Sequence, residues 1–237
     1  MIYPLEIITP TLEARGISYD KETLARLDRY AQLLVEWNGK MNLTAITDPE
    51  GIVIKHFLDC ALLLKQVDMP KGAFVVDVGT GAGFPGMVLK IFRPDISLTL
   101  LDGLNKRLKF LDAVADELGL DVKTVHLRAE EAGKKPDFRE RFDLVTARAV
   151  AELRTLYEYC LPLCKTGGIF CAMKGPSAKE ELNSAGRALS ILGGGKAELK
   201  AETLTGAETR VFVVTKKISQ TPPKYPRISA KISKQPL

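Results

Sequence analysis

Asp77-Val78-Gly79-Thr80-Gly81-Ala82-Gly83-Phe84-Pro85-Gly86 is the stretch of this 237-residue chain that decides the fold. It follows a short apolar run typical of a buried strand and precedes a predicted helix. Glycines at such a junction let the backbone turn sharply and approach a ligand closely. In an open parallel sheet that ligand lies beyond the carboxyl ends of the strands. The stretch therefore predicts the ligand-binding loop of a doubly wound α/β sheet.

The apolar runs around this stretch alternate with helical patterns. Residues 104–118 carry leucine or alanine at steps of 4, 3, 4 and 3, the spacing of one helix face. Strands alternating with helices predict a mostly parallel sheet with helices on both faces. The last two runs have no helix between them, so they predict an antiparallel hairpin turning at Gly206-Ala207. The expected strands are 73–78, 97–102, 121–126, 142–147 and 168–173, and the hairpin strands are 196–204 and 209–215.

The two ends of the chain differ from this central part. Leucines and alanines at helical spacing over residues 24–34, with Asp20 as a plausible N-cap, predict a first helix. Asp48-Pro49 predicts the start of a second, because proline is favoured at the first helical position. Four prolines after Lys217 predict an extended or mobile tail. We therefore expect a helical extension (1–70) packed on the core, a main domain (71–217) and a tail (218–237).

Composition excludes several classes of protein. The chain is 46% hydrophobic and 27% charged, which is ordinary for a globular protein. No apolar run reaches the ~18 residues that span a bilayer, and the first residues do not resemble a signal peptide. Four cysteines are too few for a disulfide scaffold, and two histidines make a metal site a poor expectation. We expect a cytoplasmic protein with buried, reduced thiols, no metal and no membrane contact.

Two cofactor classes fit the glycine stretch. Gly81 to Gly86 matches G-x-G-x-x-G, the signature of dinucleotide-binding oxidoreductases. The earlier pattern, an acid followed by Gly-x-Gly-x-Gly, is that of S-adenosylmethionine (SAM) methyltransferases. The dinucleotide match begins two residues late for a strand end, and Phe84-Pro85 would crowd a pyrophosphate. We favour SAM, with Gly79 and Gly81 under its methionine part.

Polar residues at other predicted strand ends complete this hypothesis. Asp102 ends the second strand, where a carboxylate can accept hydrogen bonds from both ribose hydroxyls; the alternative is an N-cap for the next helix. Arg128-Ala129-Glu130 follows the third strand, where adenine would lie. Arg148 follows the fourth, within reach of a carboxylate or an RNA phosphate. Lys174 ends the fifth and is a weaker candidate for the same cleft.

Together these motifs resemble the bacterial 16S rRNA guanine-N7 methyltransferases, the glucose-inhibited division protein B family. Their order along almost the whole chain makes the resemblance specific. Two departures are Gly103, where the family usually has serine, and a tail without the usual glycine and proline. The matching segments are Trp37-Asn38, Asn42-Leu43-Thr44, 56–59, 77–86, Leu101-Asp102, Lys106-Arg107, 128–130, Phe142-Asp143, 147–149 and Tyr225-Pro226-Arg227.

The resemblance implies methyl transfer from SAM to N7 of a guanine in the decoding region of 16S rRNA, free or in a small-subunit particle. It implies a SAM-dependent methyltransferase fold with an N-terminal helical extension. A small-molecule methyltransferase and a non-catalytic, SAM-retaining assembly factor remain as alternatives, and we expect a monomer. The implied cofactor contacts are Gly79, Phe84, Asp102, the backbone of Gly103 and Leu104, Ala129, Glu130 and Arg148.

The chemistry of this reaction needs no general base, because guanine N7 carries a lone pair and no proton. His56 and Asp59 lie three residues apart and could form a catalytic pair, but we favour a role in tying the extension to the domain.

The net charge of +5 resides in residues 216–237, which hold six basic and no acidic residues. The rest of the chain holds 28 basic and 29 acidic residues. We therefore predict RNA contacts at Arg148, Lys174, Lys224 and Arg227, and expect deletion of 218–237 to weaken RNA binding while leaving SAM affinity intact.

Overall fold

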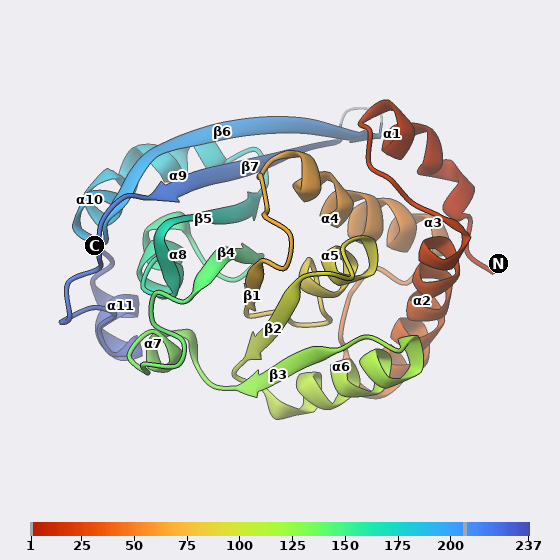
Figure 1. Ribbon diagram of the computed structural model, residues 1–237, viewed down its shortest axis with the longest axis horizontal. Coiled ribbons are helices and arrows are strands. Elements are labelled where there is room, and N and C mark those ends of the chain that lie inside the picture. The colour runs from red at the N-terminus through yellow and green to blue at the C-terminus, as the bar shows by residue number, and fades with distance from the viewer. Residues whose placement is uncertain (1, 206–207) are drawn as a thin grey trace.

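A mixed sheet forms the centre of the molecule (Figure 1). The computed structural model describes residues 2–205 and 208–237, so the expected hairpin turn at 206–207 lies outside the described residues. Within them, the strand order is β3-β2-β1-β4-β5-β7-β6, parallel as far as β5 and antiparallel across β7 and β6. The strands are β1 (Phe74–Val78), β2 (Ser97–Asp102), β3 (Val122–His126), β4 (Phe142–Arg148), β5 (Cys164–Lys174), β6 (Gly194–Thr205) and β7 (Glu208–Lys217).

The strand order shows where the ligand-binding crevice expected of such a sheet should lie. β1 pairs with β2 on one side and with β4 on the other, so successive crossovers leave β1 in opposite directions. Ligands of doubly wound sheets bind at such a reversal, outside the carboxyl ends of the strands. The loops after β1 and β4 flank this position, which is where the glycine stretch and Arg148 lie.

Helices cover both faces of the sheet, as predicted (Figure 1). One apolar core joins α2, α5 and α6 to one face, and a second joins α8 and α10 to the other. The α-helices are α1 (Thr9–Ala14), α2 (Lys21–Met41), α3 (Pro49–Ile52), α4 (Asp59–Ala61), α5 (Gly86–Phe92), α6 (Asn105–Leu118), α7 (Ala129–Ala132), α8 (Leu153–Cys160), α9 (Ala178–Ser184), α10 (Gly186–Ile191) and α11 (Ser229–Lys234). Short turns η1 (Leu5–Ile7) and η3 (Leu62–Lys65) are 3-10 helices, and η2 (Val53–Leu58) is a π-helix.

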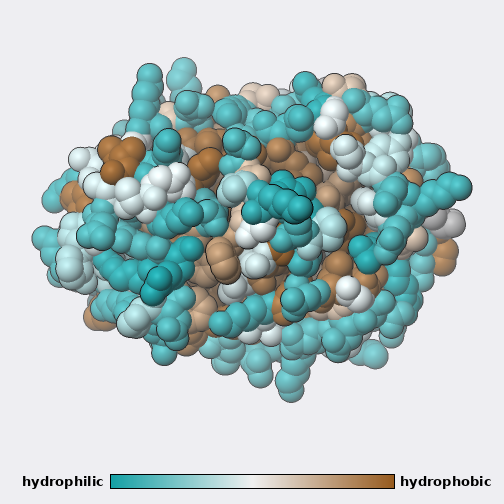
Figure 2. Space-filling view, viewed as in Figure 1, coloured by the Kyte–Doolittle hydropathy of each residue, from teal (hydrophilic) through white to brown (hydrophobic). Residues whose placement is uncertain are grey.

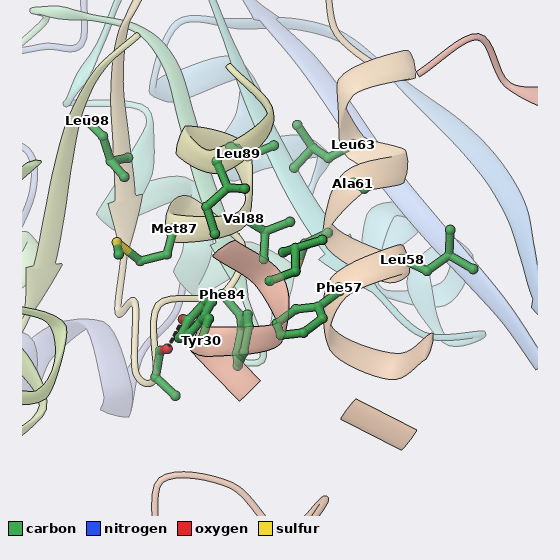
Figure 3. Packing of buried hydrophobic residues seen from close by; sticks show 14 of the residues in the cluster. Tyr30, Phe57, Leu58, Ala61, Leu63, Phe84, Met87, Val88, Leu89 and Leu98 are labelled. Carbon is green, nitrogen blue, oxygen red and sulfur yellow. Dashed lines mark hydrogen bonds between the residues drawn. The ribbon is translucent and has the colours of Figure 1, made fainter. Parts of the chain in front are cut away.

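The N-terminal helices pack against the first of these cores. Asp20 caps α2 through the backbone N–H of Thr23 at 2.7 Å, as its sequence position predicts. Tyr30 of α2 meets Phe57 of η2 and Phe84 of the glycine stretch, with ring centroids 5.7 and 5.4 Å away (Figure 3). The same core holds the buried face of α5, so the helical extension lies directly against the glycine stretch.

The second predicted helix is a single helical segment with an irregular middle. It begins at Pro49, with the Asp48 side chain accepting from the N–H of Gly51, and continues through η2, α4 and η3. Periodicity alone predicts its position but not its π-helical turns. π-Helical turns are rare and occur often at functional sites.

The expectation of an extended or mobile tail is wrong. Residues 229–234 form α11, and long-range side chains hold the segment before it. Arg139 donates to the carbonyl oxygens of Thr221 at 2.6 Å and Tyr225 at 2.8 Å. Arg227 forms an ion pair with the fully buried Glu158 at 2.6 Å. The prolines do exclude regular structure from residues 222–226, but these distant partners satisfy the backbone there, which no local pattern reveals.

The surface is mostly polar on the side shown in Figure 2. Hydrophilic side chains cover most of the face in view, with smaller hydrophobic areas between them (Figure 2). Among the described residues, no helix is both long and apolar enough to cross a membrane.

Candidate active site

The glycine stretch forms a tight loop bound to the end of β2. Gly79, Gly81 and Gly83 have φ of 66°, 59° and 95°, a region that side chains disfavour. The N–H of Gly79 donates to the carbonyl of Leu101 at 2.8 Å. The N–H of Gly81 donates to Asp102 Oδ2 at 2.9 Å. Two hydrogen bonds from backbone N–H groups to the end of β2 therefore help to hold the shape of the loop.

Asp102 is buried and organises the loops on both sides of it. Besides Gly81, it accepts from the N–H of Leu104 at 2.8 Å and lies 3.4 Å from Arg107 Nη1. Helix α6 begins with Leu104 as its N-cap, so Asp102 is not the N-cap itself. Each carboxylate oxygen can accept more than one hydrogen bond, so this arrangement still leaves acceptor capacity for a hydroxyl.

Asp77 has an unusual unpaired oxygen. Its Oδ2 accepts from Thr80 Oγ1 at 2.7 Å and from the N–H of Gly86 at 2.9 Å. Its Oδ1 is buried and has no partner among the described residues. Burial raises the pKa of Asp77 to about 6, although those two hydrogen bonds oppose the shift. A buried acceptor without a donor beneath a ligand-binding loop fits a group bound from outside, such as an ammonium or a water.

A small cavity lies between the glycine loop and the end of β3. It measures about 130 Å³, and its lining includes Asp102, Glu130 and Tyr159. Val150 covers it: a Cβ on Gly79 would lie 2.8 Å from Val150 Cγ2. Ligand pockets usually measure about 300–1,000 Å³, so the cavity holds only part of a nucleoside cofactor while Val150 stays in place.

A second cavity of about 480 Å³ opens on the other side of the segment 148–150. It lies at the carboxyl ends of β4 and β5, between the helical extension and β7. Its lining is mixed in charge, with Lys55, Arg148, Lys174 and Arg210 beside Glu181 and Glu208. Ala149 lines this cavity and Val150 the first, so one short segment separates the two. The arrangement suits two ligands that meet at that segment.

Arg148 is held by the helical extension. It donates to Asp59 Oδ2 at 3.1 Å and to the carbonyl of Lys55 at 3.0 Å, and its guanidinium lies 4.9 Å from the centre of the Phe84 ring. Asp59 is fully buried and accepts from Arg210 Nε at 2.6 Å through its other oxygen. This confirms the interpretation that Asp59 ties the extension to the domain.

The environment of His56 also argues against a catalytic pair. His56 stacks on Phe84, with ring centroids 4.5 Å apart, and lies 2.9 Å from Thr44 Oγ1. Burial, together with Arg148 and Arg210, lowers the pKa of His56 to about 3. An imidazole with so low a pKa is a poor proton acceptor at neutral pH. His56 therefore also ties the extension to the site.

The cysteines offer no nucleophile for this site. All four are buried and free. Burial raises the pKa of Cys171 to about 12, and raises that of Cys60, Cys160 and Cys164 as well. The thiolate form that reacts is therefore scarce.

Other residues predicted for the site lie at its rim. The carbonyl oxygen of Gly103 accepts a hydrogen bond from His126 Nε2 at 3.1 Å. A Cβ on Gly103 would meet only Arg128 Cγ at 3.8 Å, so a serine would fit there. Ala129 and Glu130 begin α7 and line the small cavity, while the Leu104 side chain is exposed.

The residues predicted to contact RNA differ in their positions and in the partners that they already bind. Lys174 forms an ion pair with Glu181 at 2.7 Å and donates to the carbonyl of Ala151 at 2.9 Å. Arg227 is paired with Glu158, away from the second cavity. Lys224 is exposed, with Nζ 5.4 Å from the centre of the Tyr225 ring. The structure thus keeps Arg148 and Lys174 beside one cavity and leaves Lys224 and Arg227 in the tail.

Sequence reasoning missed several residues that line the two cavities, among them Arg210, Tyr159 and Val150. Arg210 reaches Asp59 from a strand 151 positions away, and Tyr159 reaches the small cavity from α8. Val150 gave a local signal, since it follows Arg148 at a strand end, but only the fold shows that it lies over Gly79. The other two gave no such signal.

The chain is similar to known proteins over most of its length. A family model described as rRNA small subunit methyltransferase G matches residues 23–209. A protein named ribosomal RNA small subunit methyltransferase G from Alkaliphilus metalliredigens is 48% identical over 224 residues, 94% of each chain. Its namesake from Acetivibrio thermocellus is 49% identical, over 94% of this chain and 92% of its own.

Solved structures confirm the predicted fold. A SAM-dependent O-methyltransferase from Thermotoga maritima aligns with a TM-score of 0.54 at 15% identity, over 80% of this chain and 72% of its own. The match of the family model over most of the chain, with relatives this similar over nearly its whole length, shows that the chain belongs to the rRNA small subunit methyltransferase G family.

Proposed function

We propose that this enzyme transfers a methyl group from SAM to N7 of a guanine in the decoding region of 16S rRNA. The observation that carries the proposal is the pair of cavities on either side of the segment 148–150, one below the glycine loop and one at the ends of β4 and β5. The first suits the cofactor and the second the acceptor base. They meet at Ala149-Val150, where the methyl group would cross.

The residues in and beside the first cavity suit the parts of SAM. Asp102 would hold the ribose hydroxyls, and Ala129 and Glu130 would border the adenine. Gly79 and Gly81 would lie under the methionine part. When bound, SAM supplies a methyl group made electrophilic by its sulfonium. Loop 149–152 has to shift to admit it, because Val150 occupies the space over Gly79.

The chemistry suits an acceptor that carries no proton. N7 of guanine attacks through a lone pair, so the enzyme needs to align the base and exclude water rather than remove a proton. The low pKa of His56 and the raised pKa of Cys60 agree with a site that lacks a base. Alignment of two reactants alone can contribute about 7–11 kcal/mol.

The guanine has to be reachable, so we propose a single-stranded or loop target. Lys224 in the tail is exposed and stays a proposed phosphate contact. Lys174 and Arg227 would support RNA binding through the ion pairs that they already form with Glu181 and Glu158. We also propose a monomeric, cytoplasmic enzyme that uses no metal; within the described residues no three His, Cys, Asp or Glu side chains gather as a metal site would require.

The test is methyl transfer to defined acceptors. Purified enzyme is mixed with methyl-labelled SAM and with naked 16S rRNA, small ribosomal subunits or a pool of small metabolites. Label in 7-methylguanine, mapped to one position of the decoding region, is the expected result. A reaction without enzyme serves as the blank, and Asp102→Ala, which should bind SAM more weakly, should label the acceptor more slowly.

Three other outcomes would contradict the proposal. Label in a metabolite would indicate a small-molecule methyltransferase. Label on another atom of the rRNA would refute the N7 assignment. Bound SAM without transfer to any acceptor would indicate a non-catalytic assembly factor.

A further inference from the structure

The cavity at the ends of β4 and β5 is lined by more charged side chains than methyl transfer requires. Alignment of N7 needs only a shaped wall, yet six charged side chains line this 480 Å³ space. Four of them are committed elsewhere. Arg148 and Arg210 bind Asp59, and Lys174 binds Glu181 at 2.7 Å.

Of the two carboxylates in the lining, Glu181 is already satisfied. Its Oε2 accepts from Lys174 and from the N–H of Leu153 at 2.9 Å, and its Oε1 accepts from Ser177 Oγ at 3.1 Å. It would have to break these contacts to bind a ligand. Among the described residues, the Glu208 side chain has one polar contact, a loose ion pair.

That ion pair joins Glu208 to Lys55. Glu208 Oε2 lies 3.5 Å from Lys55 Nζ, and their side chains are 43% and 46% exposed. An exposed pair at this distance contributes little to stability, so a ligand can enter between the two groups at small cost. The Lys55 backbone is fixed, because its carbonyl accepts from Arg148 Nη1 at 3.0 Å.

We propose that Lys55 and Glu208 recognise the Watson–Crick edge of the target guanine, which rests on the function proposed above. Guanine presents the acceptor O6 beside the donors N1–H and N2–H. An ammonium next to a carboxylate matches that order, with Lys55 donating to O6 and Glu208 accepting from N1–H and N2–H. N7 lies on the opposite side of O6 and keeps its lone pair free for the methyl group.

The same pair excludes adenine. Adenine presents an amino group where guanine has O6, and a bare nitrogen where guanine has N1–H. Lys55 would then face a donor and Glu208 an acceptor, so both charged groups would lose hydrogen bonds on binding. Proteins read the edges of unstacked RNA bases in this manner. A site built for hydrogen bonds rejects a base that cannot form them more strongly than shape alone does.

Glu208 can be tested because its two conceivable roles predict opposite changes in kcat/KM when its charge is removed. As a mere negative charge at the rim it repels phosphates, so Glu208→Gln would strengthen RNA binding and raise kcat/KM. As a guanine contact it stabilises the bound base, so Glu208→Gln would lower kcat/KM about tenfold or more, the effect of losing a charge-assisted hydrogen bond. Lys55 gives no such contrast, because removing a positive charge weakens RNA binding in either role.

The experiment measures methyl transfer by the full-length enzyme into small ribosomal subunits, and SAM affinity by calorimetry. Glu198→Gln is the matched control, since Glu198 lies on the neighbouring strand, is 66% exposed and has only a 3.8 Å contact with Lys200. We expect kcat/KM to fall for Glu208→Gln and to stay within about twofold of wild type for Glu198→Gln. SAM affinity should be unchanged in both.

A second measurement replaces the target guanine by inosine, which lacks the 2-amino group. The wild-type enzyme should methylate the inosine substrate more slowly than the guanine substrate, and Glu208→Gln should treat the two alike. An unchanged or increased kcat/KM for Glu208→Gln would overturn this inference while leaving the proposed function standing. A wild-type enzyme that labels no guanine N7 would instead refute the proposed function, and this inference with it.

Discussion

Arg148 at the end of β4 donates a hydrogen bond to Asp59 of α4 across 3.1 Å, although the two residues are 89 positions apart. Asp59 is fully buried and binds Arg210 of β7 at the same time. One carboxylate therefore joins the helical extension to two strands of the sheet, directly beside the proposed acceptor cavity. Burial raises the pKa of Asp59, an effect that the two guanidinium groups oppose.

Replacing this carboxylate should destabilise the protein. Asp59→Asn keeps the shape of the side chain but leaves two guanidinium groups without their counter-charge. We expect the free energy of unfolding to fall by about 3 kcal/mol, the lower end for a broken buried ion pair. Urea denaturation measures it, with Glu36→Gln on the exposed side of α2 as the control. Equal midpoints for Asp59→Asn and the wild type would contradict this role.

Asp102 should determine cofactor affinity. Asp102→Asn loses the charge that orders the N–H groups of Gly81 and Leu104 and that would hold the ribose. We expect SAM to bind about tenfold or more weakly, as for the loss of one charge-assisted hydrogen bond. Calorimetry measures the dissociation constant, and Asp116→Asn on the exposed side of α6 is the matched control. An unchanged constant would remove Asp102 from the cofactor site.

The tail should affect SAM binding as well as RNA binding. Arg227→Met leaves Glu158 buried without its partner, so we expect a loss of about 3 kcal/mol in stability. Pro226 packs on Gly133 at the end of α7, next to the proposed adenine contacts, so SAM affinity should fall too. This replaces our expectation from charge alone that the tail could be removed without loss of SAM affinity. Lys231→Met, at an exposed position of α11, should change neither quantity.

His56 should make stability depend on pH. Its pKa is about 3 in the folded protein, because of burial and then Arg148, and near 6.5 in the unfolded chain. Between these values the unfolded state binds the extra proton, so stability falls as pH drops below 6.5. From pH 7 to 5 the wild type should lose about 2 kcal/mol more than His56→Asn. Parallel losses in the two proteins would show that His56 titrates normally, and NMR titration of its imidazole checks this directly.

Local sequence patterns predicted the strands well. The predicted run 97–102 is β2 itself, and the other parallel strands lie within a few residues of their predicted bounds. Their apolar residues alternate with turn-forming glycines and acids, a signal contained in a few neighbouring positions. The same holds for the cap at Asp20 and for the loop around Gly79.

Interactions between distant segments could not be predicted in this way. The tail contains enough proline to resemble a disordered segment, and only the positions of Arg139 and Glu158 in the fold explain its order. The basic residues of segment 216–237 also differ in ways that the sequence does not show, because Lys217 is fully buried and Arg227 is paired. Residue types alone do not distinguish a solvated cation from one that holds the fold together.

The position of the tail also affects how the protein is made. Chains emerge from the ribosome with the N-terminus first, and structure forms as they emerge. Residues 221–227 contact Gly133 at the end of α7, Arg139 after it, and Glu158 of α8. These contacts cannot form until residues 221–227 have emerged. A nascent chain can therefore form the glycine loop before the proposed adenine end of the cofactor site, which waits for residues 221–227.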